Sequence, residues 1–325
     1  MQYRNLVKTG IRVSTLCLGT GEYGNQVTEK EAGRIMSSAI AAGVNFFDTA
    51  DAYAEGRSEE IIGRTLKNKR QSIVLATKVG RVTEPGQRSF DLSHRYIMKG
   101  VENSLRRLQT DYIDVYYVHA PDPNTPIQET LHALDALVQQ GKVRHIGCDD
   151  FRAWQLCKAL WVSDRDNLAR FDCIELPYNL ITRDIDTELL PLCASEDVGV
   201  CVFNPLAGGL LTGKHDPDKP PAEGTRFTLK HVGKMYRERY WSPVNFDAVA
   251  RLKNIADEYG HTLTQLALAW TIQNKTITAA VCGASSVEQI EENVVAIETK
   301  LSPEELAACD GIWEQIRPKR FWDGR

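Results

Sequence analysis

Four residues of the types that move protons and stabilise charge occur near the ends of apolar runs in the first 120 residues. Asp48 ends one run, and Tyr53 follows it by five residues. Lys78 lies near the end of the next run, and His119 ends a third. Reducing a carbonyl by hydride makes an alkoxide that must be protonated, and a tyrosine hydroxyl can donate that proton. An ammonium beside the phenol would lower its pKa.

This chemistry assigns a catalytic role to each of the four. Tyr53 is the predicted proton donor, and Lys78 is predicted to make it more acidic. Asp48 would hold Lys78 and offset its charge, while His119 would donate a hydrogen bond to the carbonyl oxygen. Each residue alone has a structural alternative, as a helix cap, a loop aromatic, a lysine that reaches solvent or a core histidine. The set is hard to explain as packing, because a buried unpaired Lys or Asp is costly.

The elements that must position these residues follow a repeating pattern. Eight short runs are apolar along their whole length, as strands covered on both faces are. These predicted strands are 13–19, 44–48, 73–79, 113–119, 143–148, 172–176, 199–204 and 278–283. Helices are predicted at 28–42, 93–108 and 126–140, and another begins at Ser302-Pro303.

This alternation predicts an α/β fold, a single (β/α)8 TIM barrel domain over residues 1–325. Residues 2–10 would form a short hairpin or plug, and the Pro-, Gly- and Lys-rich stretch 212–245 a long loop after strand seven. In such a barrel the residues that end the strands converge on one rim, which would bring the four catalytic candidates together.

Composition excludes several other classes. The chain has 325 residues, a net charge of −4 and no basic tract that favours nucleic acid. No apolar run approaches a membrane span, and residues 1–10 lack the apolar core of a signal peptide. Eight cysteines form no C-x-x-C pair, and seven histidines show no metal-ligand spacing. We therefore expect a cytoplasmic protein without a metal site and without nucleic-acid or membrane partners.

The segment Gly19-Thr20-Gly21-Glu22-Tyr23-Gly24 matches the G-x-G-x-x-G dinucleotide fingerprint literally. A Rossmann domain is the alternative that it raises, but Glu22 and Tyr23 crowd the turn, and the strand-end residues would stay unexplained. The preferred interpretation is a first loop beside the active site. In it, Gly19 and Thr20 are cofactor candidates and Tyr23 is a substrate candidate.

Three blocks of the sequence resemble the aldo-keto reductase superfamily, namely Gly43–Tyr53, Ala76–Lys78 and Asp114–His119. Further blocks at 178–183, 204–214 and 235–241 resemble its aflatoxin-aldehyde and succinic-semialdehyde reductase branch. The resemblance extends from about Ile11 to Leu301. It implies a small carbonyl substrate, NADP(H) as cofactor with NAD(H) left open, and a homodimer as a candidate assembly.

The resemblance also implies where the cofactor would bind. Phe203 would stack on the nicotinamide, and the loop after it would hold the pyrophosphate. A second block after strand eight would hold the adenosine phosphate and the adenine at a helix N-terminus. The implied residues of these two blocks are Asn204, Leu206, Gly208, Gly209, Leu210, Lys214, Arg226, Gly283, Ser285, Gln289, Glu292 and Asn293.

The chain departs from the superfamily pattern at the nicotinamide carboxamide. Asp149, Asp150 and Glu175 stand where Ser, Asn and Gln are usual. An ionised carboxylate accepts hydrogen bonds but cannot donate one, and clustered carboxylates raise one another's pKa. The carboxamide would be rotated, an acid would be protonated, or affinity would fall. We expect cofactor binding to persist and to depend on pH.

Residues 226–241 combine basic and aromatic side chains. The segment is predicted either as a solvated loop or as a lid with an arginine for an anionic substrate group. Its substrate candidates are Tyr236, Arg237, Arg239 and Trp241.

Two other functions stay open. One is an NAD(P)-dependent sugar or alcohol dehydrogenase on the same barrel. The other is a cofactor-binding regulatory protein like the channel-associated β subunits of the superfamily.

Overall fold

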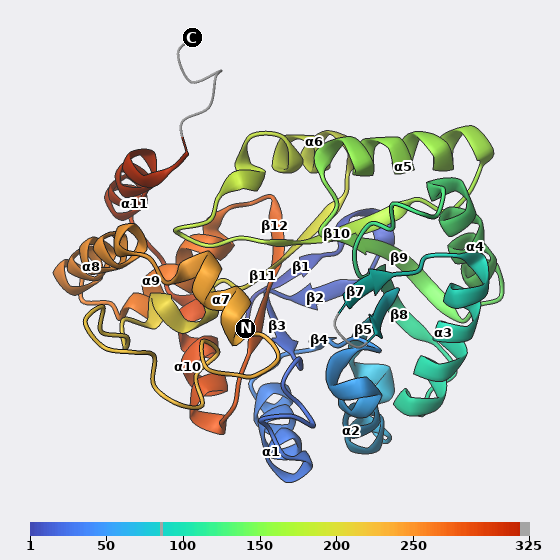
Figure 1. The fold of residues 1–325 in the computed structure, drawn as a ribbon, viewed down its shortest axis with the longest axis horizontal. Helices are drawn as coiled ribbons and strands as arrows, with labels where there is room; N and C mark the ends of the chain where they lie inside the picture. The colour runs from blue at the N-terminus through green and yellow to red at the C-terminus, as the bar shows by residue number, and fades with distance from the viewer. Residues whose placement is uncertain (85–86, 319–325) are drawn as a thin grey trace. The chain divides into compact units, whose positions relative to one another are not determined.

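The computed structural model describes residues 1–84 and 87–318, shown in Figure 1. The chain divides into two compact units. Unit 1 comprises Met1–Leu176, Ile185–Phe203 and Lys275–Val294, and unit 2 comprises Pro177–Asp184, Asn204–Asn274 and the chain from Val295. The single domain expected over 1–325 stays a prediction.

A closed barrel of eight strands forms the centre of unit 1, which confirms the (β/α)8 fold. Its order is β10-β11-β12-β3-β4-β5-β8-β9, with parallel registers such as Cys17↔Phe46 and Glu175↔Asp149. The strands are β3 Leu16–Gly19, β4 Phe46–Asp48, β5 Val74–Val79, β8 Ile113–Val118, β9 Val143–Asp149, β10 Phe171–Pro177, β11 Gly199–Phe203 and β12 Ile277–Gly283.

The predicted strand 13–19 is wrong as one element, because the chain breaks at Thr15. Its first part is β2 (Arg12–Ser14), which pairs antiparallel with β1 (Tyr3–Asn5). The Thr15 N–H donates to the Gln2 carbonyl at 3.0 Å, so it stays with the hairpin. The expected N-terminal hairpin is thereby confirmed, and Leu6 and Val13 from it are buried in the barrel's apolar core.

A second hairpin, β6 (Arg81–Glu84) with β7 (Gln87–Phe90), was not predicted, and its residues 85–86 lie outside the described residues.

Helices follow the strands as the pattern predicted. Thr28 and Ser93 accept hydrogen bonds from the backbone three residues on, so α1 and α3 begin where their capping residues indicated. Unit 1 contains α1 Glu29–Ala41, α2 Arg57–Leu66, α3 His94–Leu108, α4 Ile127–Gln139, α5 Ala153–Asp166 and α6 Leu189–Glu196, and α10 Val287–Glu298 begins in it.

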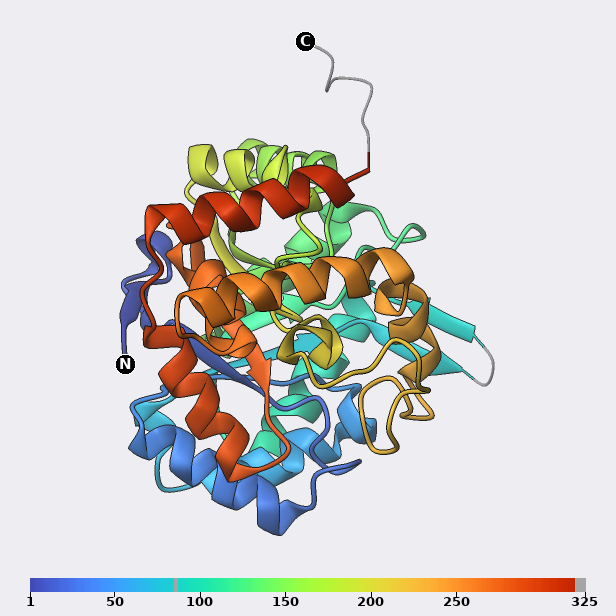
Figure 2. The same cartoon turned by 90° about the vertical axis from the view of Figure 1, so that its left-hand side faces the viewer.

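Unit 2 contains α7 Gly233–Tyr240, α8 Pro243–Glu258, α9 Leu263–Gln273 and α11 Pro303–Ile316. The capping box of Ser302 and Glu305 starts α11, as expected. In Figure 2, α8 and α11 run side by side. The predicted long loop 212–245 contains α7 as its helical piece.

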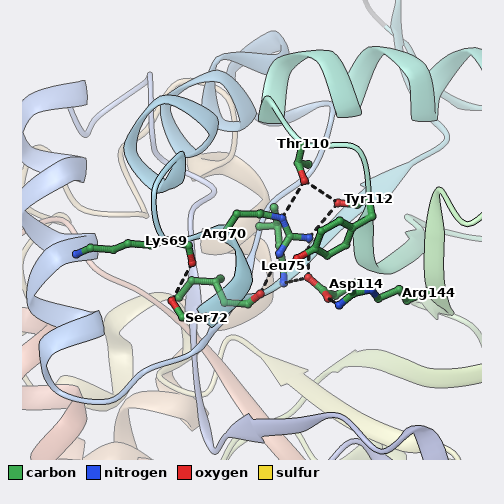
Figure 3. Close-up of polar contacts among 9 residues, drawn as sticks. Lys69, Arg70, Ser72, Leu75, Thr110, Tyr112, Asp114 and Arg144 are labelled. Atoms are coloured by element: carbon green, nitrogen blue, oxygen red, sulfur yellow. Dashed lines mark hydrogen bonds and ion pairs between the residues drawn. The ribbon is translucent and has the colours of Figure 1, made fainter.

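One buried carboxylate ties together the amino ends of three barrel strands (Figure 3). Asp114 of β8 accepts from the Leu75 N–H at 3.0 Å. Its two oxygens lie 2.7 Å from an Arg70 nitrogen and 2.9 Å from an Arg144 nitrogen. The two guanidinium carbons lie 3.9 and 3.8 Å from the centre of the Tyr112 ring. Ion pairs and cation–π contacts therefore fix this end of the barrel.

Candidate active site

The structure brings the four predicted catalytic residues together at the carboxyl ends of β4, β5 and β8. The Lys78 ammonium forms an ion pair with Asp48, and their side chains are 0% and 3% exposed. The Tyr53 and His119 rings meet edge to face with centroids 5.8 Å apart. The Lys78 nitrogen lies 5.7 Å from the centre of the Tyr53 ring. The convergence follows from the parallel barrel, which collects strand ends at one rim.

A tight turn presents Tyr53 to this cluster. The Asp51 N–H donates to the Lys78 carbonyl at 3.1 Å, so the chain beyond β4 stays attached to β5. The Tyr53 N–H then donates to the Ala50 carbonyl at 3.1 Å. Ala54 takes a left-handed backbone with φ 49°, which turns the chain into α2. The four residues between Asp48 and Tyr53 therefore form a structured connection.

Glu175, at the end of β10, is a second carboxylate on the same lysine. Its Oε2 lies 3.1 Å from the Lys78 nitrogen, and its side chain is 4% exposed. Asp48 and Glu175 therefore share the Lys78 ammonium. The sequence marked Glu175 only as an unusual residue at the carboxamide position. The position of Glu175 near the end of a predicted strand was the sequence feature that could have indicated its contact with Lys78.

The net effect on the Tyr53 pKa is opposite to the one predicted. Burial raises the pKa above its ordinary value, Lys78 opposes the rise, and the charges of Asp48, Glu175 and Asp149 add to it. Lys78 thus acts in the predicted direction, but burial and the acids outweigh it. The hydroxyl therefore stays protonated at neutral pH, which is the form that a proton donor needs.

Lys78 keeps its charge although it is fully buried. Burial by itself lowers its pKa, but Asp48 and Glu175 outweigh burial and raise it well above the ordinary value. The acids behave in the opposite way. Burial and the Asp48 charge raise the pKa of Glu175 to about 8. Burial and Glu175 raise that of Asp149 well above its ordinary range. The charges of Glu175 and Asp150 thus act on Asp149 in the predicted direction, whereas the charge that raises the pKa of Glu175 is that of Asp48.

The third acid of the predicted carboxamide site lies apart from this cluster. Asp150 is exposed and takes a left-handed backbone with φ 56°. Its N–H donates to the Glu175 carbonyl at 3.1 Å, which holds the turn after β9 against β10. Asp149 and Glu175 are therefore the buried acids, and Asp150 is the exposed one.

The other cofactor candidates of unit 1 lie around the same rim. The Phe203 ring is partly exposed at the end of β11. The Thr20 hydroxyl is occupied within the protein, since it donates to the Asp48 carbonyl at 2.8 Å and accepts from Ser58. Gly19 ends β3 next to it.

After β12, a contact within the chain organises the predicted phosphate-binding loop. Both the N–H and the hydroxyl of Ser285 contact the Gln289 side-chain oxygen, at 2.9 and 3.1 Å. Asn293 is buried, whereas Glu292 and Gly283 are exposed. The two polar residues predicted to grip a phosphate thus hold one another.

Unit 2 carries the predicted pyrophosphate loop, Asn204–Leu210 with Lys214, and the further cofactor candidate Arg226. Gly208 and Gly209 both have positive φ, 68° and 100°, so glycine is required by the backbone there. A Cβ on Gly209 would lie 3.8 Å from the exposed Lys214 nitrogen, so the ammonium lies beside the Gly209 backbone. In the same unit Leu206 is partly exposed, Leu210 is buried, and the Arg226 guanidinium lies over the Tyr236 ring.

The substrate candidates are mostly engaged in packing. Tyr23 of unit 1 and Tyr236 of unit 2 are both buried, and Tyr236 donates to the Asn204 side chain at 2.7 Å. The Trp241 ring packs against those of His215 and Phe227 within unit 2. Arg237 donates to the Phe227 carbonyl, whereas Arg239 is exposed. An anion clamp stays a prediction.

Residues 1–84 and 87–318 lack two features, a metal-binding group of side chains and a membrane-spanning helix. No group of three His, Cys, Asp or Glu side chains is placed to hold a metal ion in that part of the chain. Within the same residues, no helix combines the length and apolarity needed to cross a membrane.

Comparison with known proteins defines the class. Residues 15–314 match the Aldo/keto reductase family. A probable voltage-gated potassium channel subunit beta of Arabidopsis thaliana is 38% identical over 328 aligned residues, 98% of each chain. A protein of the same description from Oryza sativa subsp. japonica is 37% identical over the same share. The chain therefore belongs to the aldo/keto reductase family. It is an oxidoreductase of the kind that acts on carbonyl groups, and members of this family generally use NAD(P)H.

Proposed function

We propose that this protein reduces aldehydes or ketones to alcohols with NADPH and that Tyr53 donates the proton. One observation carries the proposal: a buried Lys78–Asp48 ion pair lies beside the Tyr53–His119 pair at the carboxyl rim of the barrel. A phenol, an imidazole and a buried ammonium suit the protonation of a developing alkoxide.

The residues of unit 1 fit a nicotinamide ring at this rim. Phe203 offers a partly exposed aromatic face. Asp149 is buried, and its Oδ1 has no hydrogen-bond partner among the described residues. A buried polar atom without a partner favours a polar ligand group at that place, such as a carboxamide. The second part of the cofactor site, from Asn204 to Arg226, stays a prediction within unit 2.

Each catalytic side chain then has a defined task. When bound, the cofactor supplies the hydride. Tyr53 keeps its proton until negative charge develops on the substrate oxygen, and its hydroxyl then gives the proton to that oxygen. Lys78 stabilises the phenolate that remains, and Asp48 holds Lys78 in place. His119 donates a hydrogen bond to the same substrate oxygen and so orients it.

The test is Tyr53→Phe assayed on a panel of carbonyl substrates with NADPH and with NADH. We expect kcat to fall by about 10²–10⁴, as for the loss of a general acid. Cofactor binding, followed by fluorescence titration, should stay close to wild type. Tyr259→Phe, an exposed tyrosine of unit 2, is the matched control. A Tyr53→Phe protein that turns over at the wild-type rate would exclude the proposed donor.

The names of the relatives favour a second candidate, a cofactor-binding regulatory subunit. The same assay separates the two functions. Tight cofactor binding with slow turnover that is equal in wild type and Tyr53→Phe would support the regulatory role. A dehydrogenase would instead oxidise alcohols with NAD faster than it reduces the matching carbonyls. NADPH over NADH, a cytoplasmic location and a homodimer belong to the proposal as predictions.

A further inference from the structure

Three carboxyl groups face one ammonium in the active-site cluster of Asp48, Lys78, Asp149 and Glu175. All four side chains are buried. If every group were ionised, the cluster would hold two negative charges more than positive ones. An uncompensated buried charge is expensive, so such groups take up protons instead. The cluster must therefore carry protons on its acids at neutral pH.

The geometry indicates which acid holds one of these protons. Asp48 and Glu175 both pair with the Lys78 ammonium inside the buried cluster. Two ionised carboxylates beside one ammonium leave a buried negative charge uncompensated, so one of the two acids keeps a proton. Asp48 forms the hydrogen-bonded ion pair with Lys78, while Glu175 lies 3.1 Å from the same nitrogen. Glu175 interacts less closely with the ammonium than Asp48 does, so Glu175 is the acid that keeps the proton.

We propose that Glu175 is a positioning residue for Lys78 and that it acts as the protonated partner of Asp48. The ammonium then lies between one carboxylate and one neutral acid. When Glu175 loses its proton to solvent, a second negative charge appears beside Lys78. That charge competes with Tyr53 for the ammonium, so the phenolate loses stabilisation. This kinetic consequence rests on the proposed function, but the protonation itself does not.

The titratable groups that face Glu175 from neighbouring elements leave few alternatives for the loss of a proton near neutral pH. They are Cys17 of β3, Asp48 of β4, Tyr53 after β4, Lys78 of β5, Tyr117 of β8, Asp149 of β9 and Cys201 of β11. Burial raises the pKa of the thiols and phenols, so these stay neutral. Glu175 has a pKa of about 8. The pKa of Asp149 is also raised by burial and by Glu175, so Asp149→Asn is the control for that acid.

The first experiment follows the protonated carboxyl groups by infrared absorption of the C=O stretch, on the protein with no added ligand. We expect wild type to lose one absorption with a midpoint near pH 8 from Glu175. A second loss near pH 7 is expected from Asp51, another acid whose pKa burial raises, and Asp51→Asn identifies it. Glu175→Gln should lack the loss near pH 8, because the amide has no proton to release. Asp149→Asn, the neighbouring buried acid, should retain it. A loss near pH 8 that disappears in Asp149→Asn but persists in Glu175→Gln overturns the proposal, as does no titration near pH 8 in wild type.

The second experiment compares kcat at pH 9 and pH 6.5 for the same proteins. One pH unit above its pKa, an acid is about one-tenth protonated, so wild-type kcat should fall about tenfold. For Glu175→Gln the fall should be less than about twofold. An equal fall in both proteins would contradict the positioning role.

The two experiments distinguish a failure of the proposed function from a failure of the role proposed for Glu175. If wild type does not turn over at any pH, the proposed function fails while the infrared titration still decides the role of Glu175. If Glu175→Gln does not fold, Asp51→Asn and Asp149→Asn decide. A loss of absorption near pH 8 that both variants retain supports the proposal, and one that either variant abolishes overturns it.

Discussion

The two ends of the barrel carry charge clusters of opposite composition, each built on buried carboxyl groups. At the amino end, the single carboxylate of Asp114 faces the guanidiniums of Arg70 and Arg144 and a backbone N–H. At the carboxyl end, the ammonium of Lys78 faces the carboxyl groups of Asp48 and Glu175, with Asp149 beside them. Both clusters join neighbouring strands of the same sheet, so their difference does not come from the fold.

The difference lies in how completely each charge is satisfied. Both Asp114 oxygens have charged partners, and the arginines are further held by the Tyr112 ring. Such a cluster resists change and contributes stability. The carboxyl-end cluster has fewer positive charges than carboxyl groups, so protons must balance the excess negative charge. The protonation of its acids therefore varies with pH. A cluster that stabilises and a cluster suited to chemistry can therefore be told apart by their charge balance.

The largest expected effect comes from removing the Lys78 ammonium from the carboxyl-end cluster. Lys78→Met should lower kcat by at least about 10³, because the phenolate of Tyr53 loses its stabilisation. Steady-state kinetics measures this, and circular dichroism checks the fold. Lys142→Met, a more exposed lysine paired with Glu102, is the control and should keep wild-type kcat. More than a tenth of wild-type activity in Lys78→Met would contradict the role of the ammonium.

The matching change at the amino end should affect stability and not catalysis. Asp114→Asn leaves two guanidiniums without their carboxylate, and we expect the free energy of unfolding to fall by about 3 kcal/mol. Chemical denaturation measures this, and kcat below the unfolding transition should be unchanged. The exposed Asp111→Asn should show neither effect. A loss of activity in folded Asp114→Asn would mean that the two ends are coupled.

The pH dependence of stability separates the ends further. The pKa of Glu175 is raised in the folded protein from 4.5 to about 8. Its contribution to stability is therefore complete below about pH 4.5 and is lost as pH rises through about 8. Relative to Glu175→Gln, wild type should lose up to about 1.4 kcal/mol of unfolding free energy per pH unit within that window. Denaturation at pH 5, 7 and 9 tests this, and parallel curves for the two proteins would refute it.

The smallest effect is expected at the exposed half of the Asp114 cluster. The Arg144 side chain is 53% exposed and that of Arg70 is 12% exposed. Arg144→Ala should cost less than about 1 kcal/mol, because solvent screens exposed ion pairs. Arg70→Ala should cost more, since it also removes hydrogen bonds to the Ile73 and Tyr112 carbonyls. Equal losses of unfolding free energy in the two variants would show that burial does not set their contributions.

Patterns that span whole elements were readable from the sequence. Continuous apolar runs identified the barrel strands, and Thr28, Ser93 and Ser302 marked helix starts that the structure confirms. Strand-end position was sufficient to bring Lys78 and His119 to one rim. Local exceptions were not readable. Residues 13–19 look like one strand by hydrophobicity, and only the pairing of β2 with β1 divides them.

Side-chain partners were the least predictable part of the site. The contact of Glu175 with Lys78 joins two distant strands, β10 and β5, and the spacing of residues along the chain does not reveal it. The net direction of the Tyr53 pKa depends on burial, which outweighs the nearest charge. The Ser285–Gln289 contact likewise comes from a loop conformation that the residue types alone do not determine.

The hairpin residues Leu6 and Val13 have a consequence for how the acidic cluster exchanges protons. They pack with Phe46, Val115 and other apolar side chains into a continuous apolar layer inside the barrel. Such a layer offers no polar partners to water, so the carboxyl rim is the favoured route for proton exchange with Glu175. A ligand seated at that rim would therefore slow this exchange.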